Sequence, residues 1–421
     1  MAGRRLVATV ISAAFVVAGQ TPVAQETPDT TPPSCEKLQS KAKEGQLEAW
    51  MSEEGGVFDE IVESPETYRA QVLVNEVVPR KGASDCLIER GYRTDAEYVY
   101  PASAIKTVGA VAALRLVMER ARRDLDARLG LDSVLWYRRP ENFDDLESTE
   151  YHWKLGGTLR EIIEKTLVVS SNEDFNKLYD LVGHRALNEW MWEAGLESLR
   201  MKHRMFSKRT VEEQKWTPKV GVGESEERKT VRPARRSDLE LEETPASRIE
   251  VGETHVDFIT GEYREEPMDF SDKNYISVRD LQRLMLGILR PDLADVDFYG
   301  LDTYRGFLKR TLATHPDAES EEEKRNLVRR FSPMYPGFSD VVGEERLEYV
   351  NKAGRAYGFH LDNAYVVDEK TGRELFVTAV IYVNENEKLN DNQYQYEEKS
   401  YPFLEGVGRV VAKHLLSPNQ K

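Results

Sequence analysis

The stretch Ser103-Ala104-Ile105-Lys106 opens a predicted helix and decides how the rest of the chain is interpreted. A serine and a lysine three residues apart lie on one face of a helix, one turn from each other. A lysine amine in a closed, partly dry site loses its proton more easily, so it can act as a general base toward the hydroxyl. An extended run at 97–100 precedes the pair, and an apolar helical stretch at 107–118 follows it. This context predicts Ser103 as a nucleophile and Lys106 as its base.

The same spacing recurs at Ser34-Cys35-Glu36-Lys37. A capping serine followed by a surface lysine produces this spacing equally well, so that interpretation stands as the alternative for Ser103 and Lys106. The second copy follows a segment rich in proline and threonine, and polar residues come after it. We therefore expect the second copy to be a solvated helix start.

Ser170-Ser171-Asn172 lies between two predicted helices, so its side chains can point into a cleft. Ser170 is a candidate for passing a proton to a leaving group, and Asn172 for orienting the lysine and a substrate carbonyl. The alternative is that Ser171 or Asn172 simply caps the next helix.

Asn351-Lys352-Ala353-Gly354-Arg355 forms the end of a predicted strand. Lys352 can supply positive potential to a site, and Gly354 lets a backbone N–H approach a substrate closely. A strand-end lysine followed by a turn glycine is the alternative. Lys370-Thr371-Gly372 has the same form, but it lies between two strong strands and is rich in turn formers. We expect it to be an exposed hairpin turn.

Taken in order, Ser-x-x-Lys, Ser-x-Asn and Lys-x-Gly resemble the signature of the serine β-lactamases and penicillin-binding proteins. Residues 170–176 resemble the class A β-lactamase stretch Ser-Asp-Asn-Thr-Ala-Ala-Asn, including its second asparagine, Asn176. Residues 277–281 resemble the Thr-Pro-Arg-Asp-Met helix start of that family, with Val278 in place of the proline. The resemblance covers about residues 36–416, apart from a charged segment.

The resemblance implies a role for each site residue. Ser103 would attack a strained lactam or a D-alanyl amide and form an acyl-enzyme, with Lys106 as the proton acceptor. Ser170 would relay a proton to the leaving nitrogen, and Lys352 would attract a substrate carboxylate. The backbone N–H groups of Ser103 and Arg355 would form an oxyanion hole. The resemblance implies no cofactor and no metal ion.

Two departures from the family pattern concern substrate binding and deacylation. Ala353 stands where the family usually has threonine or serine, and the neighbouring Arg355 is the candidate that compensates for the lost hydroxyl. The Glu-x-x-Leu-Asn string of class A enzymes does not occur at the matching place. Glu212, Glu213 and Glu224 are the candidates for activating the deacylating water. Without such a glutamate, acylation would proceed and hydrolysis would stall.

Strand-rich segments at both chain ends flank a helical block, which predicts an α+β fold. We expect a β-lactamase/transpeptidase-like architecture, with an antiparallel sheet built from both chain ends, flanking helices and an inserted helical domain. Residues 36–102 and 330–421 are assigned to an α/β subdomain, and 103–329 to a helical subdomain. Residues 206–275 are charged and poor in apolar side chains, so we expect an insertion outside the core, with a small hairpin at 255–263.

Periodicity and turn signals assign the individual elements. Helices are predicted at 36–51, 103–129, 159–168, 175–181, 186–194, 278–289, 304–312 and 404–416. Thr158 and Glu161 form a predicted capping box. Strands are predicted at 68–78, 86–93, 346–351, 363–367 and 375–383.

The chain of 421 residues carries a net charge of −16 and no long basic block, so we expect no nucleic-acid partner. A positive start and a short apolar segment predict an export signal at 1–24, with cleavage at Gly19 or Ala24. Residues 25–35 are expected to be a disordered tail. We expect a periplasmic or secreted monomer with no membrane span after cleavage. Its partner would be a small molecule, either a β-lactam or a peptidoglycan peptide.

Cys35 and Cys86 are the only cysteines, and both follow the predicted signal. In an oxidising compartment two such cysteines can form a disulfide, and two separate buried thiols are the alternative. Neither cysteine has a His/Cys cluster nearby, which argues against a zinc site.

These observations together favour an exported serine hydrolase that opens the β-lactam ring through an acyl-enzyme. Three alternatives stay open. They are a D-alanyl-D-alanine carboxypeptidase that acts on peptidoglycan peptides, a penicillin sensor that is acylated without turnover, and an inactive relative.

Overall fold

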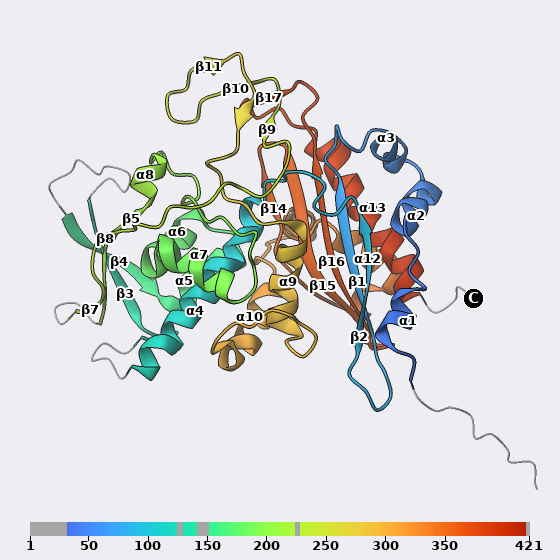
Figure 1. Cartoon of the computed structure of the whole chain (residues 1–421), viewed down its shortest axis with the longest axis horizontal. Coiled ribbons are helices and arrows are strands. Elements are labelled where there is room, and N and C mark those ends of the chain that lie inside the picture. The colour runs from blue at the N-terminus through green and yellow to red at the C-terminus, as the bar shows by residue number, and fades with distance from the viewer. Residues whose placement is uncertain (1–31, 124–128, 141–150, 224–227, 418–421) are drawn as a thin grey trace, which may run out of the picture.

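The computed structural model describes residues 32–123, 129–140, 151–223 and 228–417 (Figure 1). The predicted export signal at 1–24, and the predicted tail as far as residue 31, lie outside these described residues. Among the residues that are described, no helix is long and apolar enough to cross a membrane.

The centre of the molecule is an antiparallel sheet in the order β13-β15-β16-β1-β2, in which β14 continues the line of β13 along β15. Its strands are β1 (Gln71–Val78), β2 (Cys86–Tyr92), β13 (Leu347–Asn351), β14 (Gly354–Ala356), β15 (Phe359–Asp368) and β16 (Arg373–Tyr382). Strand β1 joins the two chain ends, because Val74 pairs with Val377 of β16 and with Arg90 of β2. The predicted α+β fold, with an antiparallel sheet built from both chain ends, is confirmed.

One face of this sheet is covered by helices from both chain ends (Figure 1). They are α2 (Gln46–Glu54), α3 (Val57–Glu63), α12 (Tyr335–Val342) and α13 (Tyr401–Val411). Phe58 and Phe403 pack edge to face within the apolar cluster that these helices bury. The predicted single helix at 36–51 is wrong, because the chain divides it into α1 (Cys35–Gln39) and α2, with Gly45 at a left-handed φ of 72° between them.

A disulfide between Cys35 and Cys86 ties α1 to β2 across a separation of 51 residues. In the chain-entropy account, closing a loop of this length stabilises the fold by about 4 kcal/mol. We expect the Cys35→Ser/Cys86→Ser double variant to lose about that much free energy of unfolding, measured by urea titration at pH 7. Equal urea midpoints for the two chains would contradict this prediction.

The opposite face of the sheet carries α9 (Val278–Leu289), at the residues predicted, packed against β1, β15 and β16. The further helices on this side are η1 (Ala102–Ile105), α4 (Lys106–Arg122), α5 (Leu159–Leu167), α6 (Asn172–Val182), α7 (His184–Glu193), η2 (Leu301–Tyr304) and α10 (Arg305–Leu312). The predicted capping box of Thr158 and Glu161 is confirmed at the start of α5. The run at 97–100 is buried, but it forms no strand.

Residues 206–275 are not a purely external insertion, and that expectation is wrong. Val220, Val231, Phe270 and Tyr275 are buried in the larger apolar cluster, and three cations of the same segment, Arg209, Lys215 and Arg232, are buried as well. The predicted hairpin is confirmed as β10 and β11. The elements of the segment are α8 (Val211–Gln214), β5 (Trp216–Thr217), β6 (Lys219–Val222), β7 (Lys229–Arg232), β8 (Arg235–Arg236), β9 (Glu250–Val251), β10 (Thr254–Val256), β11 (Tyr263–Arg264) and β12 (Met268–Asp269).

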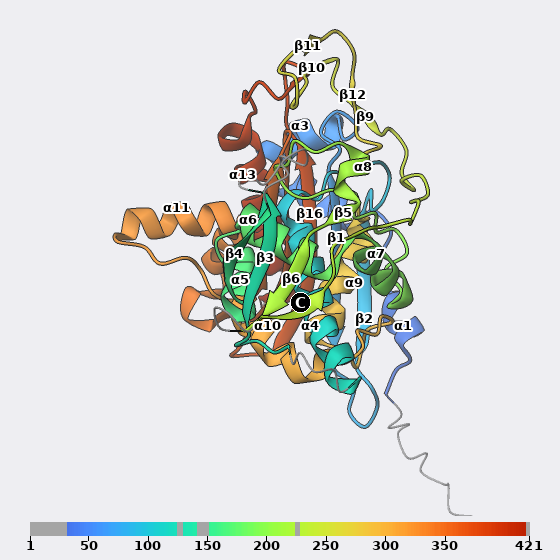
Figure 2. The ribbon, with the colours of Figure 1, turned by 90° about the vertical axis from the view of Figure 1, so that its left-hand side faces the viewer.

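A second sheet, in the order β4-β3-β6-β7, was not predicted from the sequence. Strands β3 (Val134–Pro140) and β4 (Tyr151–Thr158) lie outside α5 and α6, at the left edge of Figure 1 and the front of Figure 2. Helix α11 (Glu321–Phe331) has no buried residue and projects from the body in Figure 2. The remaining elements are η3 (Glu344–Arg346), β17 (Lys388–Leu389), η4 (Tyr396–Ser400) and η5 (Ala412–Leu416).

Candidate active site

Ser103 lies in the 3₁₀ turn η1, which leads directly into α4. Its side chain is partly exposed, whereas Ala102 and Ala104 on either side are buried. Ala102 has a φ of 45°, in the left-handed region that non-glycine residues rarely adopt. Backbone strain of this kind persists where the surrounding structure holds a functional residue in place. The fold thus presents the Ser103 hydroxyl at the start of a buried helix.

Lys106, the first residue of α4, is fully buried, and it donates hydrogen bonds to residues at the start of α6. Its Nζ donates to the carbonyl of Ser170, to the Oγ of Ser170 at 3.2 Å and to the Oδ1 of Asn172 at 2.7 Å. Burial, together with the positive charge of Lys352, holds the pKa of Lys106 well below its usual range. The interpretation of Lys106 as a surface lysine is therefore wrong.

The Ser170 hydroxyl lies between two amines. Lys352 is buried, and its Nζ donates to the Oγ of Ser170 at 3.0 Å and to the carbonyl of Ala353 at 3.3 Å. Burial lowers the pKa of Lys352 to about 8. Ser171 caps α6, because its Oγ accepts from the N–H of Asp174 at 3.2 Å. The capping role thus belongs to Ser171, and Ser170, at a strained φ of 57°, faces the lysines.

Gly354 packs directly on the turn that carries Ser103. A Cβ at Gly354 would lie 2.5 Å from the carbonyl oxygen of Pro101 and 2.9 Å from the backbone nitrogens of Ser103 and Ala104. These atoms are backbone and cannot turn aside, so only glycine fits without a shift. The close approach brings the start of β14 beside Ser103.

Ala353 and Arg355 lie on either side of Gly354. Ala353 is buried, and Arg355 is exposed. The Arg355 guanidinium donates to the hydroxyl of Tyr401 at 2.6 Å and lies over the ring of Tyr396 at 4.9 Å. These contacts direct it toward α13 and η4. That Arg355 compensates for the hydroxyl that Ala353 lacks stays a prediction.

Asp362 is a residue of this region that the sequence analysis missed. It is fully buried on β15, and its carboxylate accepts from the Nδ2 of Asn351 at 2.6 Å and from the hydroxyl of Tyr349 at 2.7 Å. Burial raises the pKa of Asp362 to about 6, and its charge partly opposes the fall in the pKa of Lys352. The signal in the sequence was a carboxylate in the first half of a strand rich in apolar residues, where a buried charge requires partners.

The glutamates considered for deacylation have local contacts. Glu212 accepts from Lys215 at 2.8 Å and also pairs with Arg236. Glu213 completes a capping box with Thr210, from whose N–H it accepts at 2.7 Å. Glu224 lies outside the described residues. Both described carboxylates are thus committed to α8 and its neighbours.

The second copies of the Ser-x-x-Lys and Lys-x-Gly motifs make none of these contacts. Ser34 caps α1, with its Oγ accepting from the N–H of Lys37 at 3.3 Å on an exposed helix start, as predicted. Lys370, Thr371 and Gly372 form the turn between β15 and β16, with Gly372 at a φ of 68°. The exposed hairpin turn predicted for this stretch is confirmed. In the described part of the chain, no group of three His, Cys, Asp or Glu side chains is arranged to hold a metal ion.

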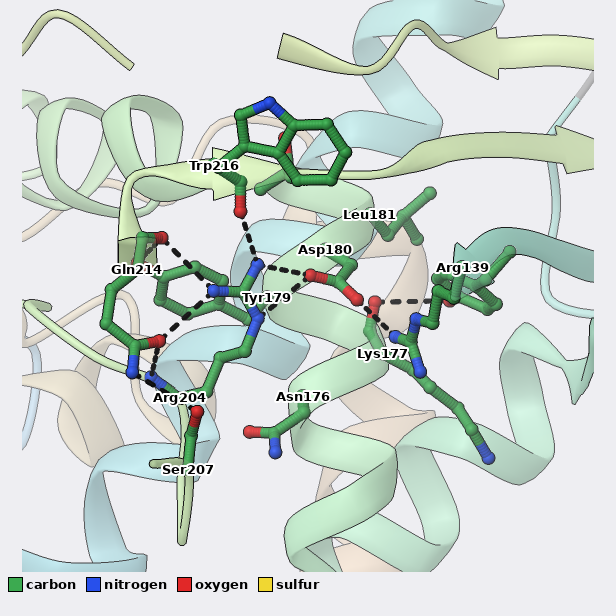
Figure 3. A network of polar contacts seen from close by, with 12 residues as sticks. Arg139, Asn176, Lys177, Tyr179, Asp180, Leu181, Arg204, Ser207, Gln214 and Trp216 are labelled. Atoms are coloured by element: carbon green, nitrogen blue, oxygen red, sulfur yellow. Dashed lines mark hydrogen bonds and ion pairs between the residues drawn. The ribbon is translucent and has the colours of Figure 1, made fainter. Parts of the chain in front are cut away.

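The loop between residue 200 and β5 is attached to α6 by a buried ion pair (Figure 3). Asp180 and Arg204 are both fully buried, and the Nε of Arg204 donates to the Asp180 carboxylate at 3.0 Å. Arg139 donates to the other carboxylate oxygen. Arg204 also donates to the carbonyls of Gln214 at 3.1 Å and Trp216 at 2.8 Å. Burial opposes the charge, yet the two arginines hold the pKa of Asp180 below its usual range.

The same loop is also anchored on α6, one helical turn after Asn172, which accepts a hydrogen bond from Lys106. Asn176, four residues after Asn172 on α6, donates to the carbonyl of Met205 at 2.9 Å and accepts from its N–H at 2.8 Å. Residues four apart lie on one face of a helix. The loop around Met205 is therefore held beside the end of α6 that contacts Lys106.

Loss of Arg204 should destabilise the fold strongly, because it leaves Asp180 buried with one cation fewer. We expect Arg204→Leu to lower the free energy of unfolding by about 3–5 kcal/mol in urea titration. Arg185→Leu is the matched control, because Arg185 pairs with the exposed Asp238 and should cost no more than about 1 kcal/mol. Equal losses in the two variants would contradict the role of burial.

A family model described as the β-lactamase enzyme family matches residues 89–414, which is most of the chain. The chain therefore belongs to the β-lactamase enzyme family. No curated protein matches it.

Several solved structures match over most of both chains. A β-lactamase from Sphaerobacter thermophilus is 12% identical, covers 89% of this chain and 98% of its own, and has a TM-score of 0.46. A β-lactamase from Streptomyces albus G is 14% identical, with coverages of 84% and 96% and a TM-score of 0.44. An acyl-enzyme complex of a PBP-A mutant with penicillin G is 15% identical, with coverages of 87% and 96% and a TM-score of 0.47.

Proposed function

We propose that this chain is a serine hydrolase of the class A type that forms an acyl-enzyme with β-lactams through Ser103. The observation that carries the proposal is the convergence of two buried amines on one hydroxyl. The Oγ of Ser170 lies 3.2 Å from the Nζ of Lys106 and 3.0 Å from the Nζ of Lys352. A hydroxyl between an amine that is readily neutral and one that is charged at neutral pH can relay a proton.

Under this proposal, acylation moves one proton from Ser103 to the leaving nitrogen of the lactam. The neutral Lys106 amine accepts the hydroxyl proton of Ser103 while the Oγ attacks the lactam carbonyl carbon. The Oγ–C bond forms, the lactam C–N bond breaks, and the proton passes from Lys106 through the Ser170 hydroxyl to the leaving nitrogen. Lys352 keeps its proton and attracts the substrate carboxylate.

The developing oxyanion is stabilised by the backbone N–H groups of Ser103 and Arg355. Donors of this kind contribute roughly 3 kcal/mol each to the transition state. The contact of Gly354 with the Ser103 turn supports this role, because it sets the β14 backbone against the residue that carries the nucleophile.

We expect Gly354→Ala to slow acylation by about 10²-fold, because a shift of roughly 1 Å in a catalytic group costs that much. The added Cβ would displace either β14 or the backbone of Ser103. The measurement is the rate of labelling by a fluorescent penicillin. Gly130→Ala is the control, because a Cβ there meets no atom within 4 Å, and it should leave the rate unchanged. Equal rates for both variants would contradict the fit at Gly354.

The proposed function is tested by treating the purified chain with a fluorescent penicillin and a chromogenic cephalosporin. A labelled band whose intact mass has increased by one penicillin supports acylation, and sustained colour adds hydrolysis. Label without sustained colour would identify an acylated sensor. Release of D-alanine from a D-alanyl-D-alanine peptide would identify a carboxypeptidase. A folded chain that gives no label would overturn the proposal.

We also propose that the chain is exported through its first 24 residues and works as a periplasmic or secreted monomer. The distribution of the tagged full-length chain between cell fractions tests export. Size-exclusion chromatography with light scattering tests the oligomeric state. A cytoplasmic chain, or a dimeric mass, would overturn the corresponding part.

A further inference from the structure

The second sheet has a buried face and an exposed face. Leu135 and Tyr137 of β3 and Val220 of β6 point inward, and the Tyr137 hydroxyl donates to the carbonyl of Lys177 on α6 at 3.1 Å. The residues that alternate with them point outward, and cross-strand register puts them on one face. With Arg228, which leads into β7, they form a surface that we name the tryptophan face: Trp136, Arg138, Trp153, Leu155, Lys219 and Arg228.

The two indoles of the tryptophan face are held in a fixed array by cations. The Arg228 guanidinium lies 4.0 Å from the ring centroid of Trp136 and 5.5 Å from that of Trp153. The Lys219 amine lies 5.8 Å from the Trp153 ring. Trp153 passes over Gly221, where a Cβ would come within 3.2 Å of the indole. The array is therefore built before any ligand arrives, which lowers the entropy cost of binding.

Within the described ranges, the cations of this face have no acidic partner. Arg138, Lys219 and Arg228 form no ion pair among the described residues, although the chain has 74 acidic residues against 58 basic ones. Arg139, which points to the other face of the same strand, pairs with Asp180. Three cations that form no ion pair with any other described residue provide a local site for an anion.

The face is also apolar and open. The Leu155 side chain is 61% exposed, and both tryptophans are partly exposed. Exposed apolar surface that is rimmed by charge marks a binding surface. Figure 2 shows β3, β4 and β6 in front of α5 and α6, on the side of the molecule away from the main sheet.

We propose that the tryptophan face binds a polysaccharide that carries spaced carboxylates. Indoles provide flat apolar surfaces for the C–H faces of sugar rings, and Arg138, Lys219 and Arg228 bind the carboxylates. The tryptophan face lies beyond α5 and α6 from the main sheet (Figure 1). The proposal does not depend on the proposed function.

Charge density separates this ligand from single-stranded nucleic acid, which also binds aromatic and cationic surfaces. A nucleic acid carries one charge per nucleotide, and a chain of net charge −16 repels it strongly. A glycan with one carboxylate per disaccharide is repelled less and matches three spaced cations. A protein partner needs roughly 20 residues on each side of a stable interface, more than the six of this face.

The direct test measures binding of hyaluronate oligosaccharides, which carry one carboxylate per disaccharide and no peptide, by calorimetry at low salt. We expect Trp153→Ala and Arg228→Gln each to weaken binding at least tenfold. Arg264→Gln removes an exposed cation from β11 that pairs with Glu262, and it should change binding less than twofold. Neutral chitin oligosaccharides should bind at least tenfold more weakly than hyaluronate.

Folding and specificity are checked in the same experiment. Both variants should keep the wild-type melting temperature and the wild-type rate of penicillin labelling, because neither residue belongs to the Ser103 site. The proposal is overturned if wild type does not bind hyaluronate, or if folded variants bind as wild type does. Tighter binding of an oligodeoxynucleotide or of polyglutamate than of hyaluronate would also overturn it, in favour of a nucleic acid or an acidic protein.

Discussion

Ser103→Ala will abolish the covalent adduct that the wild-type chain forms with a fluorescent penicillin. The substitution removes the only atom that bonds to the acyl group, and losses of roughly 10⁶-fold are typical when a nucleophilic serine is removed. Lys106, Ser170 and Lys352 keep their contacts in this variant, so substrate binding is expected to persist. Intact-mass spectrometry detects the adduct, and the labelling rate gives the fold-change.

The chain supplies its own matched control for this prediction. Ser34 has the same Ser-x-x-Lys spacing, but it caps an exposed helix. Ser34→Ala should therefore leave the labelling rate unchanged. An adduct that persists in Ser103→Ala would refute Ser103 as the nucleophile, and loss of label in Ser34→Ala would move the role to the other motif.

Elements with strong periodicity and clear caps were predicted well, because local and tertiary preferences agree there. Helix α9 has the predicted bounds, and Thr158 caps α5 as predicted. Prediction failed where the chain interrupts a pattern. The predicted helix at 36–51 is not continuous, because α1 ends at Gln39 and α2 begins only after Gly45, whose left-handed φ stands at the start of α2.

Residues 206–275 were misjudged because composition averages over the two faces of a strand. In β6 and β7, buried Val220 and Val231 alternate with polar or small neighbours. Arg204 presents a related difficulty, because an arginine predicts exposure unless its partner is known. Its partner, Asp180, lies 24 residues away, and no local pattern connects them.

The residues of the candidate site could be predicted from three sequence motifs. Their arrangement in space could not. The sequence order predicted that Lys106, Ser170 and Lys352 belong together. That Ser170 lies between both amines depends on the packing of α4, α6 and β13. Asp362 escaped prediction because its effect on Lys352 requires the register of β13 and β15, which pairs Asn351 with Ala364.

The rate of acylation by the wild-type chain will follow a bell-shaped pH profile. Lys106 must be neutral to accept the serine proton, so the rate falls as pH falls through its lowered pKa. Lys352 must stay protonated to attract the substrate carboxylate, so the rate falls again as pH rises through about 8. The labelling rate between pH 5 and 10, with folding checked at each pH, measures both limbs.

Lys352→Ala tests the origin of both limbs. It removes the group behind the alkaline limb and should lower the rate at pH 7 by about 10²-fold or more. It also removes the positive charge that depresses the pKa of Lys106, so the acid limb should move to higher pH. Lys370→Ala is the control and should leave the profile unchanged. An acid limb that does not move in Lys352→Ala would contradict the electrostatic coupling of the two lysines.

Asp362→Asn should move only the alkaline limb. The carboxylate of Asp362 favours the protonated form of Lys352, so removing its charge lowers the pKa of Lys352 further. The limb near pH 8 should therefore shift to lower pH, while the acid limb set by Lys106 stays in place. A merely structural role for Asp362 would lower the melting temperature and leave both limbs where they are. The pH profile thus separates an electrostatic role of this buried carboxylate from its contribution to packing.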